Sequence, residues 1–373
     1  MVTRRRETIA EGLAREAAES ADRDAARRRD AELHRLRHTV RRLTDEVKTL
    51  TSDLADANTY REALAYVEAN PLEPITIRPR ERKSRSNEAI GIQILSDLHV
   101  DERVDPAEVN GINEFNPTIA AERMHRLAVG TAWQLNMLRC DGARSVGYRM
   151  RELIIANLGD VTTNYLRTED LHGNAMPPMD GFVFAASLEV AYVRQVLELC
   201  PWLEKVHCPR VPGNHDRLPF ERRTPVRKRV AMSSAPLLAH MIAAELRHDP
   251  RVQIQLSPSE HVYLDVYGRK IRGMHGDRFK YNGGVGGIFV PARRHVAGLN
   301  KSIDAALTIF GHWHMSRTDD RWISNGSLIG PTPYSIAFGL DPEPPSQTLF
   351  LIDRDRGKRN VTPIQVGGKD EWS

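Results

Sequence analysis

The sequence predicts a layered α/β protein with a mixed sheet, preceded by a charged N-terminal helix. Two observations support this fold class. From Ala89 onward, short β-rich runs alternate with amphipathic stretches of helical length, as in folds that pack helices against sheets. Before that point, residues 1–70 contain no Pro and a single Gly, Gly12, and their second half repeats apolar residues at heptad spacing.

The N-terminal heptads run from residue 33 to residue 64, with apolar residues at both seam positions. The a positions are Leu33, Val40, Val47 and Leu54, and the d positions are Leu36, Leu43, Leu50, Ala57 and Leu64. This pattern predicts a parallel coiled coil and hence a homo-oligomer, with a dimer favoured. The alternative is a lone amphipathic helix packed on its own domain, for which the strict a/d stripe is narrow. Residues 1–32 lack such a stripe and are predicted to be a solvated helix or tail.

A Pro-rich segment follows the heptads. Pro71, Pro74 and Pro79 interrupt any helix there, because Pro lacks a backbone N–H and clashes with the preceding turn. The predicted organisation is therefore a charged helix over residues 1–70, a linker over 71–88 and one globular domain over 89–373.

The globular domain contains eight β-rich runs and three helical stretches. The predicted strands span residues 89–95, 152–158, 205–211, 261–268, 270–276, 306–311, 321–326 and 348–355, and the predicted helices span 117–139, 181–199 and 235–247. Helices separate the early strands and tighter turns separate the late ones, which favours a mixed sheet over an all-parallel one.

The overall composition excludes several classes of protein. The 373 residues include three cysteines, too few for a disulfide framework, which favours a reducing cytoplasm. No apolar run is long enough to span a membrane, and the first thirty residues hold no apolar segment typical of a secretory signal. The formal net charge of +4 is compatible with an anionic partner.

Polar clusters follow five of the predicted strands. They are Asp97 with His99, Gly159-Asp160, Gly213-Asn214-His215-Asp216, His275-Gly276-Asp277 and Gly311-His312-Trp313-His314. Loops at strand ends are where α/β folds place reactive groups. A single His is more often a surface or hydrogen-bonded core residue, but five such clusters in order are not explained that way. Imidazole, carboxylate and amide groups without a nearby thiolate predict a divalent-metal site.

The spacing within two clusters supports convergence on one site. In an extended backbone, alternate residues point to the same side. We therefore expect Asp97 and His99 to face one space, and His312 and His314 to do the same.

The ordered motifs D-x-H, G-D-x(3)-N, G-N-H-D, H-G-D and G-H-x-H resemble those of the calcineurin-like binuclear metallophosphoesterases, over residues 89–353. In the second motif, Asn164 stands one residue away from the family spacing, which leaves its role open. The Arg-Gly and Asn-His-Glu forms typical of protein Ser/Thr phosphatases are absent. The chain is closest in style to the DNA-repair exonuclease branch, and a bacteriophage or its bacterial host would suit it as a source.

The resemblance implies a layered β-sandwich flanked by helices and two divalent metal ions. Mn²⁺ is the first expectation, with Fe, Zn, Ni or Mg as alternatives. The implied ligands of the first ion are Asp97, His99, Asp160 and His314, and those of the second are Asp160, Asn214, His275 and His312, so that Asp160 bridges the two. Two such cations about 3.5–4 Å apart would clamp a phosphoryl group and activate a bridging water.

His215 shares a turn with Asn214 and is expected to face the substrate, where it would protonate the leaving oxygen. Asp216 follows it and either orients that imidazole or stabilises the turn. These two residues are the predicted catalytic residues beside the metal ligands.

A basic stretch lies directly downstream, in Arg217, Arg222, Arg223, Arg227, Lys228 and Arg229. Arg217, Arg222 and Arg223 are predicted to contact substrate phosphates, with a solvated face as the alternative. His172, in a long polar loop, is a further candidate at the rim.

The resulting prediction is a metal-dependent phosphodiesterase, specifically a DNA nuclease of the exonuclease kind, with nucleic acid as partner and no membrane association. Two alternatives stay open. One is a small-molecule phosphoesterase that acts on cyclic nucleotides or phosphomonoesters. The other is a coiled-coil assembly protein with a vestigial metal site.

Overall fold

The computed structural model describes residues 32, 34–48, 87–140, 147–166, 170–218, 228–280 and 287–368. The chain divides into two compact units, Met1–Glu62 and Ala63–Ser373. In the first unit, residues 34–48 are helical. Four of the predicted seam residues lie there, and their side chains are 47% to 62% exposed: Leu36, Val40, Leu43 and Val47. The later heptads and most of the predicted linker lie outside the described residues, so pairing of this helix stays a prediction.

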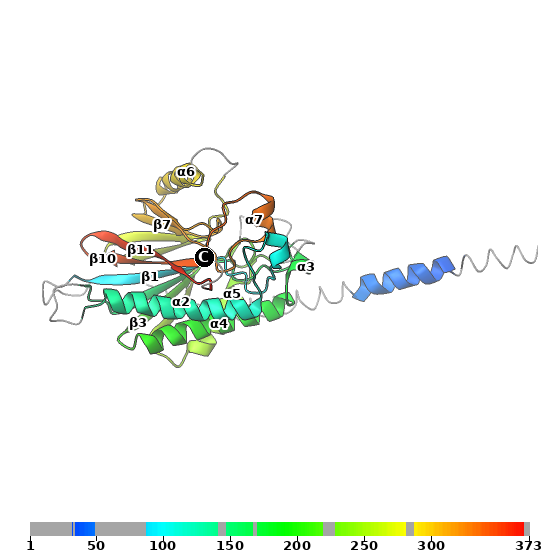
Figure 1. The fold of residues 1–373 in the computed structure, drawn as a ribbon, viewed down its shortest axis with the longest axis horizontal. Helices are drawn as coiled ribbons and strands as arrows, with labels where there is room; N and C mark the ends of the chain where they lie inside the picture. Colours follow the sequence, from blue (N-terminus) through cyan, green and yellow to red (C-terminus); the bar gives the residue numbers. More distant parts are fainter. Residues whose placement is uncertain are drawn as a thin grey trace, which may run out of the picture. The chain divides into compact units, whose positions relative to one another are not determined.

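Two sheets form the frame of the second unit (Figure 1). The first has the order β11-β10-β1-β2-β3-β4, with β1 (Ala89–Leu95), β2 (Glu152–Asn157), β3 (Lys205–Arg210), β4 (Val252–Leu256), β10 (Ser346–Asp353) and β11 (Gly357–Gln365). Strands β1 to β4 run parallel, whereas β10 is antiparallel to both β1 and β11.

The second sheet has the order β5-β6-β7-β9-β8, with β5 (His261–Val266), β6 (Arg269–Met274), β7 (Leu307–Phe310), β8 (Arg317–Thr318) and β9 (Trp322–Ser324). Strands β6, β7 and β9 are parallel, and β5 and β8 are antiparallel edge strands. The predicted mixed α/β sandwich flanked by helices is therefore confirmed.

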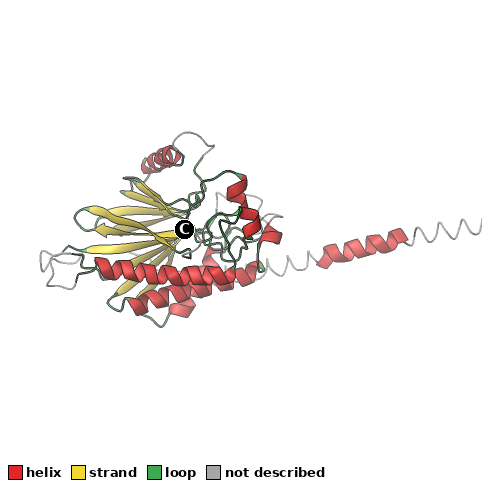
Figure 2. Ribbon diagram, viewed as in Figure 1, coloured by secondary structure: helices red, strands yellow, loops and turns green. Residues whose placement is uncertain are grey.

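Helices cover the sandwich on both outer sides (Figure 2). Helices α2 (Pro117–Leu138) and α4 (Pro178–Leu199) lie along the first sheet with α5 (Ala235–Leu246), and α6 (Phe289–Asn300) lies on the opposite side (Figure 1). Three short helices lie beyond the strand ends: η1 (Pro106–Val109), α3 (Asp170–Gly173) and α7 (Pro333–Ala337). Among the described residues, no helix has both the length and the apolarity that crossing a membrane requires.

Strand β1 shows why its sequence is a nearly continuous apolar run. Ile90, Ile92 and Ile94 point into the core between the two sheets. The alternate residues face the helices: a Cβ on Gly91 would lie 2.9 Å from the Leu135 Cδ2 of α2. A strand that is covered on both faces needs apolar or small side chains at nearly every position.

All eight predicted strands and all three predicted helices are present. The described elements that were not predicted are β4, β8, β11, η1, α3, α6 and α7. Strand β11 has a polar sequence, GKRNVTPIQ, and lies at a sheet edge where one side needs no apolar cover. Edge strands of this kind lack the hydrophobic alternation on which strand prediction depends.

Candidate metal centre

The polar clusters that follow β1, β2, β6 and β7 come together in two groups. One consists of Asp97, His99 and His314, and the other of Asp160, His275 and His312. Within each group the ligand atoms lie within 4.8 Å of one another. One carboxylate and two imidazoles per group are donors that divalent metals of intermediate hardness accept. The structure therefore brings together six of the seven predicted ligands, and it places Asp160, predicted for both ions, in the second group.

The backbone reason for this convergence differs from the expected one. Asp97 and His99 have φ of 55° and 48°, and His312 and His314 have φ of 70° and 52°. The expectation of an extended backbone in D-x-H and H-x-H was therefore wrong, because the chain turns back sharply after each strand. Left-handed backbone costs about 1–2 kcal/mol for a residue with a Cβ. Such strain concentrates where function requires a specific side-chain position.

The glycines of the motifs permit close approach of neighbouring loops. A Cβ on Gly213 would lie 2.0 Å from the Asp160 Oδ1, and one on Gly159 would lie 2.1 Å from the backbone nitrogen of Gly213. A Cβ on Gly311 would lie 2.4 Å from the Asp97 Oδ2. Only glycine fits at these three points, since any side chain would displace a carboxylate or a neighbouring backbone.

Backbone N–H groups hold both carboxylates in place. The His312 N–H faces the two carboxylate oxygens of Asp97 at 3.0 and 2.9 Å. The His215 N–H donates to the Asp160 Oδ1 at 2.7 Å. The carbonyl of Asp160 accepts from the N–H of Leu98 at 2.9 Å. These bonds tie the loops after β1, β2, β3 and β7 to one another.

The seventh predicted ligand, Asn214, faces the second group. The Nδ1 of His275 donates to the carbonyl of Leu158 at 2.8 Å, so a neutral ring carries its lone pair on Nε2. That atom lies 2.9 Å from the Asn214 Oδ1 and 2.9 Å from the Asp160 Oδ2. With a neutral ring, three acceptors would face one another, so a positive charge, either a proton on Nε2 or a bound cation, is required here. The donor set therefore fits a divalent metal ion.

Burial controls the charge of the imidazoles. It lowers the pKa of His99 to about 3 and that of His312 to about 4, because a charged ring would lose its hydration. Both rings are therefore neutral at neutral pH, the form that ligates metals. Burial also disfavours a charged His275, but the carboxylate of Asp160 outweighs this and raises the pKa of His275 to about 10. This pair binds one positive charge, as a proton or as a metal ion.

His215 lies beside the first group without joining it. Its ring stands edge-on to His99, with centroids 5.1 Å apart and an interplanar angle of 85°. Its Nδ1 donates to the carbonyl of Thr163 at 2.8 Å. The Nε2 of His215 is therefore the atom available to a substrate.

Asp216 does not orient that imidazole. One of its oxygens accepts from the N–H of Gly213 at 2.6 Å and from that of Asp160 at 3.2 Å. The contacts match the alternative role of stabilising the turn, and they correct its assignment as a catalytic residue. Asn164 also acts through the backbone: its Nδ2 donates to the carbonyls of His215 and Arg217 at 3.1 and 2.9 Å.

The basic residues are distributed differently from the prediction. Arg217 donates to the carbonyl of Asn214 at 2.9 Å and is half-buried. Arg229 is buried in ion pairs with Glu260 and Asp277, at 3.0 and 2.9 Å, which removes it from the predicted phosphate-contacting stretch. His172 is exposed on α3. The remaining candidates, Arg222, Arg223 and Arg227, lie outside the described residues.

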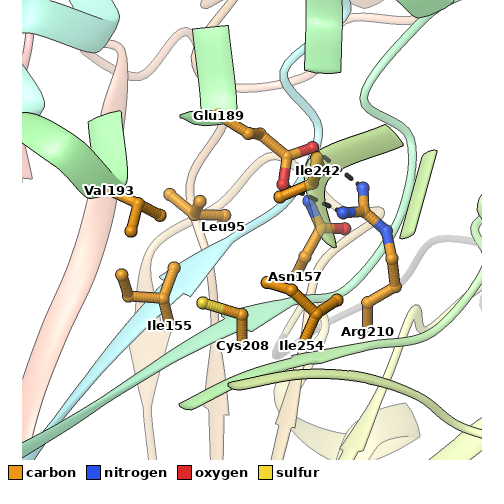
Figure 3. Close-up of a pocket in the computed structure, with 9 residues that line it drawn as sticks. All are labelled: Leu95, Ile155, Asn157, Glu189, Val193, Cys208, Arg210, Ile242 and Ile254. Atoms are coloured by element: carbon orange, nitrogen blue, oxygen red, sulfur yellow. Dashed lines mark hydrogen bonds and ion pairs between the residues drawn. The ribbon is translucent and has the colours of Figure 1, made fainter. Parts of the chain in front are cut away.

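A buried ion pair joins the end of β3 to α4 (Figure 3). Arg210, the last residue of β3, donates to both carboxylate oxygens of Glu189 in α4, at 3.0 and 2.8 Å. Asn157, the last residue of β2, accepts from the N–H of Gly159 at 3.0 Å. These three polar residues and several apolar ones line a cavity of about 10 Å³. These contacts could not be predicted from the sequence, because they join elements that are distant along the chain.

Comparisons with known proteins return distant likenesses. No protein-family model matches the chain, and no curated protein sequence matches it. A solved structure of Vps29 from Entamoeba histolytica, complexed with zinc, is 12% identical, covering 74% of this chain and 99% of that one with a TM-score of 0.28. An archaeal phosphodiesterase is 12% identical, covering 73% and 99%, with a TM-score of 0.28. A hypothetical protein from Pyrococcus horikoshii OT3 is 10% identical, covering 76% and 90%, with a TM-score of 0.35. With TM-scores this low, the likenesses do not decide the function of this chain.

Proposed function

We propose that this chain is a divalent-metal-dependent phosphodiesterase of the calcineurin-like metallophosphoesterase superfamily. One observation carries the proposal. Two adjacent groups, each of one Asp and two His, lie where the carboxyl ends of parallel strands from both sheets meet. Adjacent sites for two cations are typical of enzymes that transfer or hydrolyse phosphoryl groups.

The proposed metal ligands form two sets. Asp97, His99 and His314 would hold one ion, and Asp160, Asn214, His275 and His312 the other, with Asp160 shared between them. Bound divalent ions supply electrophilic stabilisation of the phosphoryl oxygens and an activated water. The imidazole and carboxylate donors suit Mn²⁺, Fe²⁺ or Zn²⁺ better than they suit Ca²⁺.

His215 is the residue proposed to assist the leaving group. Its Nδ1 is held by the carbonyl of Thr163, so Nε2 is directed away from that bond. In the doubly protonated ring, Nε2–H would donate its proton to the leaving oxygen. Its backbone N–H bonds to the Asp160 Oδ1. A shift of the Asp160 carboxylate would therefore move the proton donor as well.

We propose nucleic acid as the substrate class. The support is the sequence between residues 217 and 228, whose cations suit a phosphodiester backbone. Of these, Arg217 lies next to Asn214 of the centre. Arg229 no longer contributes to this support. A small-molecule phosphoester is the second candidate, and the same assay separates the two.

The test is hydrolysis with and without metal. Purified protein supplied with Mn²⁺ is expected to hydrolyse bis-p-nitrophenyl phosphate and single-stranded DNA, and EDTA is expected to abolish both activities. Asp160→Ala should be inactive, whereas Asp249→Ala, which removes a surface carboxylate paired with Arg251, should retain full activity. Hydrolysis of cyclic nucleotides but not of DNA or RNA would favour the second candidate. Absence of metal-dependent hydrolysis of every phosphoester would refute the proposal.

A further inference from the structure

We infer that Thr163 is a positioning residue that fixes the tautomers of two histidines, the proposed ligand His99 and the proposed proton donor His215. The first role depends on its side chain and the second on its backbone carbonyl. The inference deepens the proposed function and rests on it for the chemical roles of the two rings.

The side-chain role follows from a chain of two hydrogen bonds. The hydroxyl of Thr163 donates to the Glu102 Oε2 at 2.7 Å. A hydroxyl has one proton, so toward the His99 Nδ1, at 2.8 Å, it can only accept. Nδ1 of His99 must then carry the ring proton. The lone pair lies on Nε2, the atom left to bind a metal ion.

The backbone role concerns the neighbouring ring. The carbonyl of Thr163 accepts from the Nδ1 of His215 at 2.8 Å, and a carbonyl cannot donate. His215 is therefore also an Nδ1–H tautomer when neutral. One residue thus selects the same tautomer in both rings, although it contacts them through different atoms.

Thr163 is itself rigidly held. Its N–H donates to one carboxylate oxygen of Asp101 at 2.6 Å, and the N–H of Asn164 donates to the other at 3.1 Å. Asp101 is fully buried, and Thr163 is 5% exposed. Asn164 then extends the support to the carbonyl of His215. The segment is therefore fixed from both sides, as positioning of two catalytic groups requires.

Groups that bond the second nitrogen of a ligating His commonly change metal affinity by about 10–100-fold when removed. Thr163→Val deletes the hydroxyl with little change of shape and keeps the carbonyl. It should weaken one of the two Zn²⁺-binding events by about 10–100-fold in isothermal titration of the full chain. Thr163→Ser, which restores a hydroxyl, should bind both ions as the wild type does.

The chain offers a matched control one residue away. Thr162 is buried, and its hydroxyl has no hydrogen-bond partner within the described part of the chain. Thr162→Val makes the same chemical change in the same loop and should leave both Zn²⁺ affinities unchanged.

The tautomers can also be read directly from ¹⁵N-detected NMR of the imidazoles in the zinc-free wild type. Both His99 and His215 should carry their proton on Nδ1. In Thr163→Val, His99 should lose this preference and His215 should keep it, because the carbonyl remains.

These readouts need no turnover, so they separate this inference from the proposed function. If the protein hydrolyses no phosphoester, the proposed function is refuted, but the NMR measurement of the tautomers still tests the role of Thr163. Wild-type Zn²⁺ affinity at both sites in Thr163→Val would overturn the inference. So would equal loss in Thr163→Ser, or a wild-type His99 that is protonated on Nε2. The wild-type spectrum decides the question even if Thr163→Val does not fold.

Discussion

The two ligand groups have the same composition but different supports. In the second group, the Nδ1 of His275 bonds to the carbonyl of Leu158, directly after β2. In the first group, the Nδ1 of His99 bonds to the side chain of Thr163. The two groups are buried to the same degree, with two buried members and one half-buried His each. They differ in what holds the buried imidazole, which is a strand-end carbonyl in the second group and a side-chain hydroxyl in the first.

This difference indicates which substitutions should disturb each site. A backbone carbonyl at a strand end survives almost any substitution, because the sheet fixes it. The hydrogen bond from the Thr163 hydroxyl, by contrast, is lost when a single oxygen atom is removed. We therefore expect the first ion to exchange more readily and to be more sensitive to mutation than the second.

The largest expected effect follows from removing the residue shared by both groups. Asp160→Ala should lose both ions, because Asp160 is the ligand proposed to be shared by them. Metal analysis after desalting, with Asp249→Ala as control, measures this. If the variant retains two ions, Asp160 is not a shared ligand; if it retains one, the two groups are more independent than we propose.

The next effect separates catalysis from metal binding. His215→Ala should keep both ions while turnover falls by about 10²–10⁴-fold, the usual contribution of a positioned acid. A diester with a very good leaving group should suffer less, because it needs less protonation. His248→Ala, at an exposed position, serves as the control. Loss of an ion in His215→Ala would show that His215 is a ligand, and the assignment of ligands to the two groups would have to change.

A pair of glycine substitutions probes the shared ligand and a ligand of the first group. Gly213→Ala would press on Asp160, and Gly311→Ala on Asp97. Each should lower the free energy of unfolding by about 1–3 kcal/mol, as overpacking does. Gly213→Ala should weaken the binding of both ions, and Gly311→Ala mainly that of the first ion. Thermal unfolding and metal titration measure both effects.

The control for that pair is Gly298→Ala in α6, where a Cβ would meet nothing within 4 Å. It should be neutral or stabilise by up to about 1 kcal/mol, because Ala favours a helix over Gly. Equal behaviour of all three alanine variants would show that the loops do not depend on close approach.

The smallest effect on either group is expected from the N-terminal helix. Leu36→Asp with Leu43→Asp should abolish the predicted dimer, since burying each Leu contributes about 1.5–3 kcal/mol. Hydrolysis of a small chromogenic diester should be unchanged. Light scattering gives the oligomeric state, with His34→Asp and His38→Asp, off the predicted seam, as a charge-matched control. A full-length chain that is monomeric at micromolar concentration would contradict the coiled-coil prediction.

The sequence was sufficient for eight of the strands, because these depend on local order, whereas the ligand partition came from the resemblance of the motifs to a known family. A run such as AIGIQIL predicts a buried strand, and a polar cluster directly after it predicts a place at the sheet edge. The roles of Thr163 and Glu102 could not be predicted from the sequence, since their hydrogen bonds join loops that are distant in sequence. Arg229 was misassigned for the same reason: its acidic partners lie far along the chain.

The left-handed backbone of the centre has a consequence for engineering this chain. Asp97, His99, Asp160, Asn164, His312 and His314 all have positive φ, where glycine would be the more stable choice. Glycine, however, has no side chain and therefore offers neither a side-chain ligand atom nor the side-chain amide of Asn164. Directed evolution for thermal stability alone is therefore expected to replace these residues first. It should yield more thermostable variants without a metal centre. Retained cation binding has to be part of any such selection.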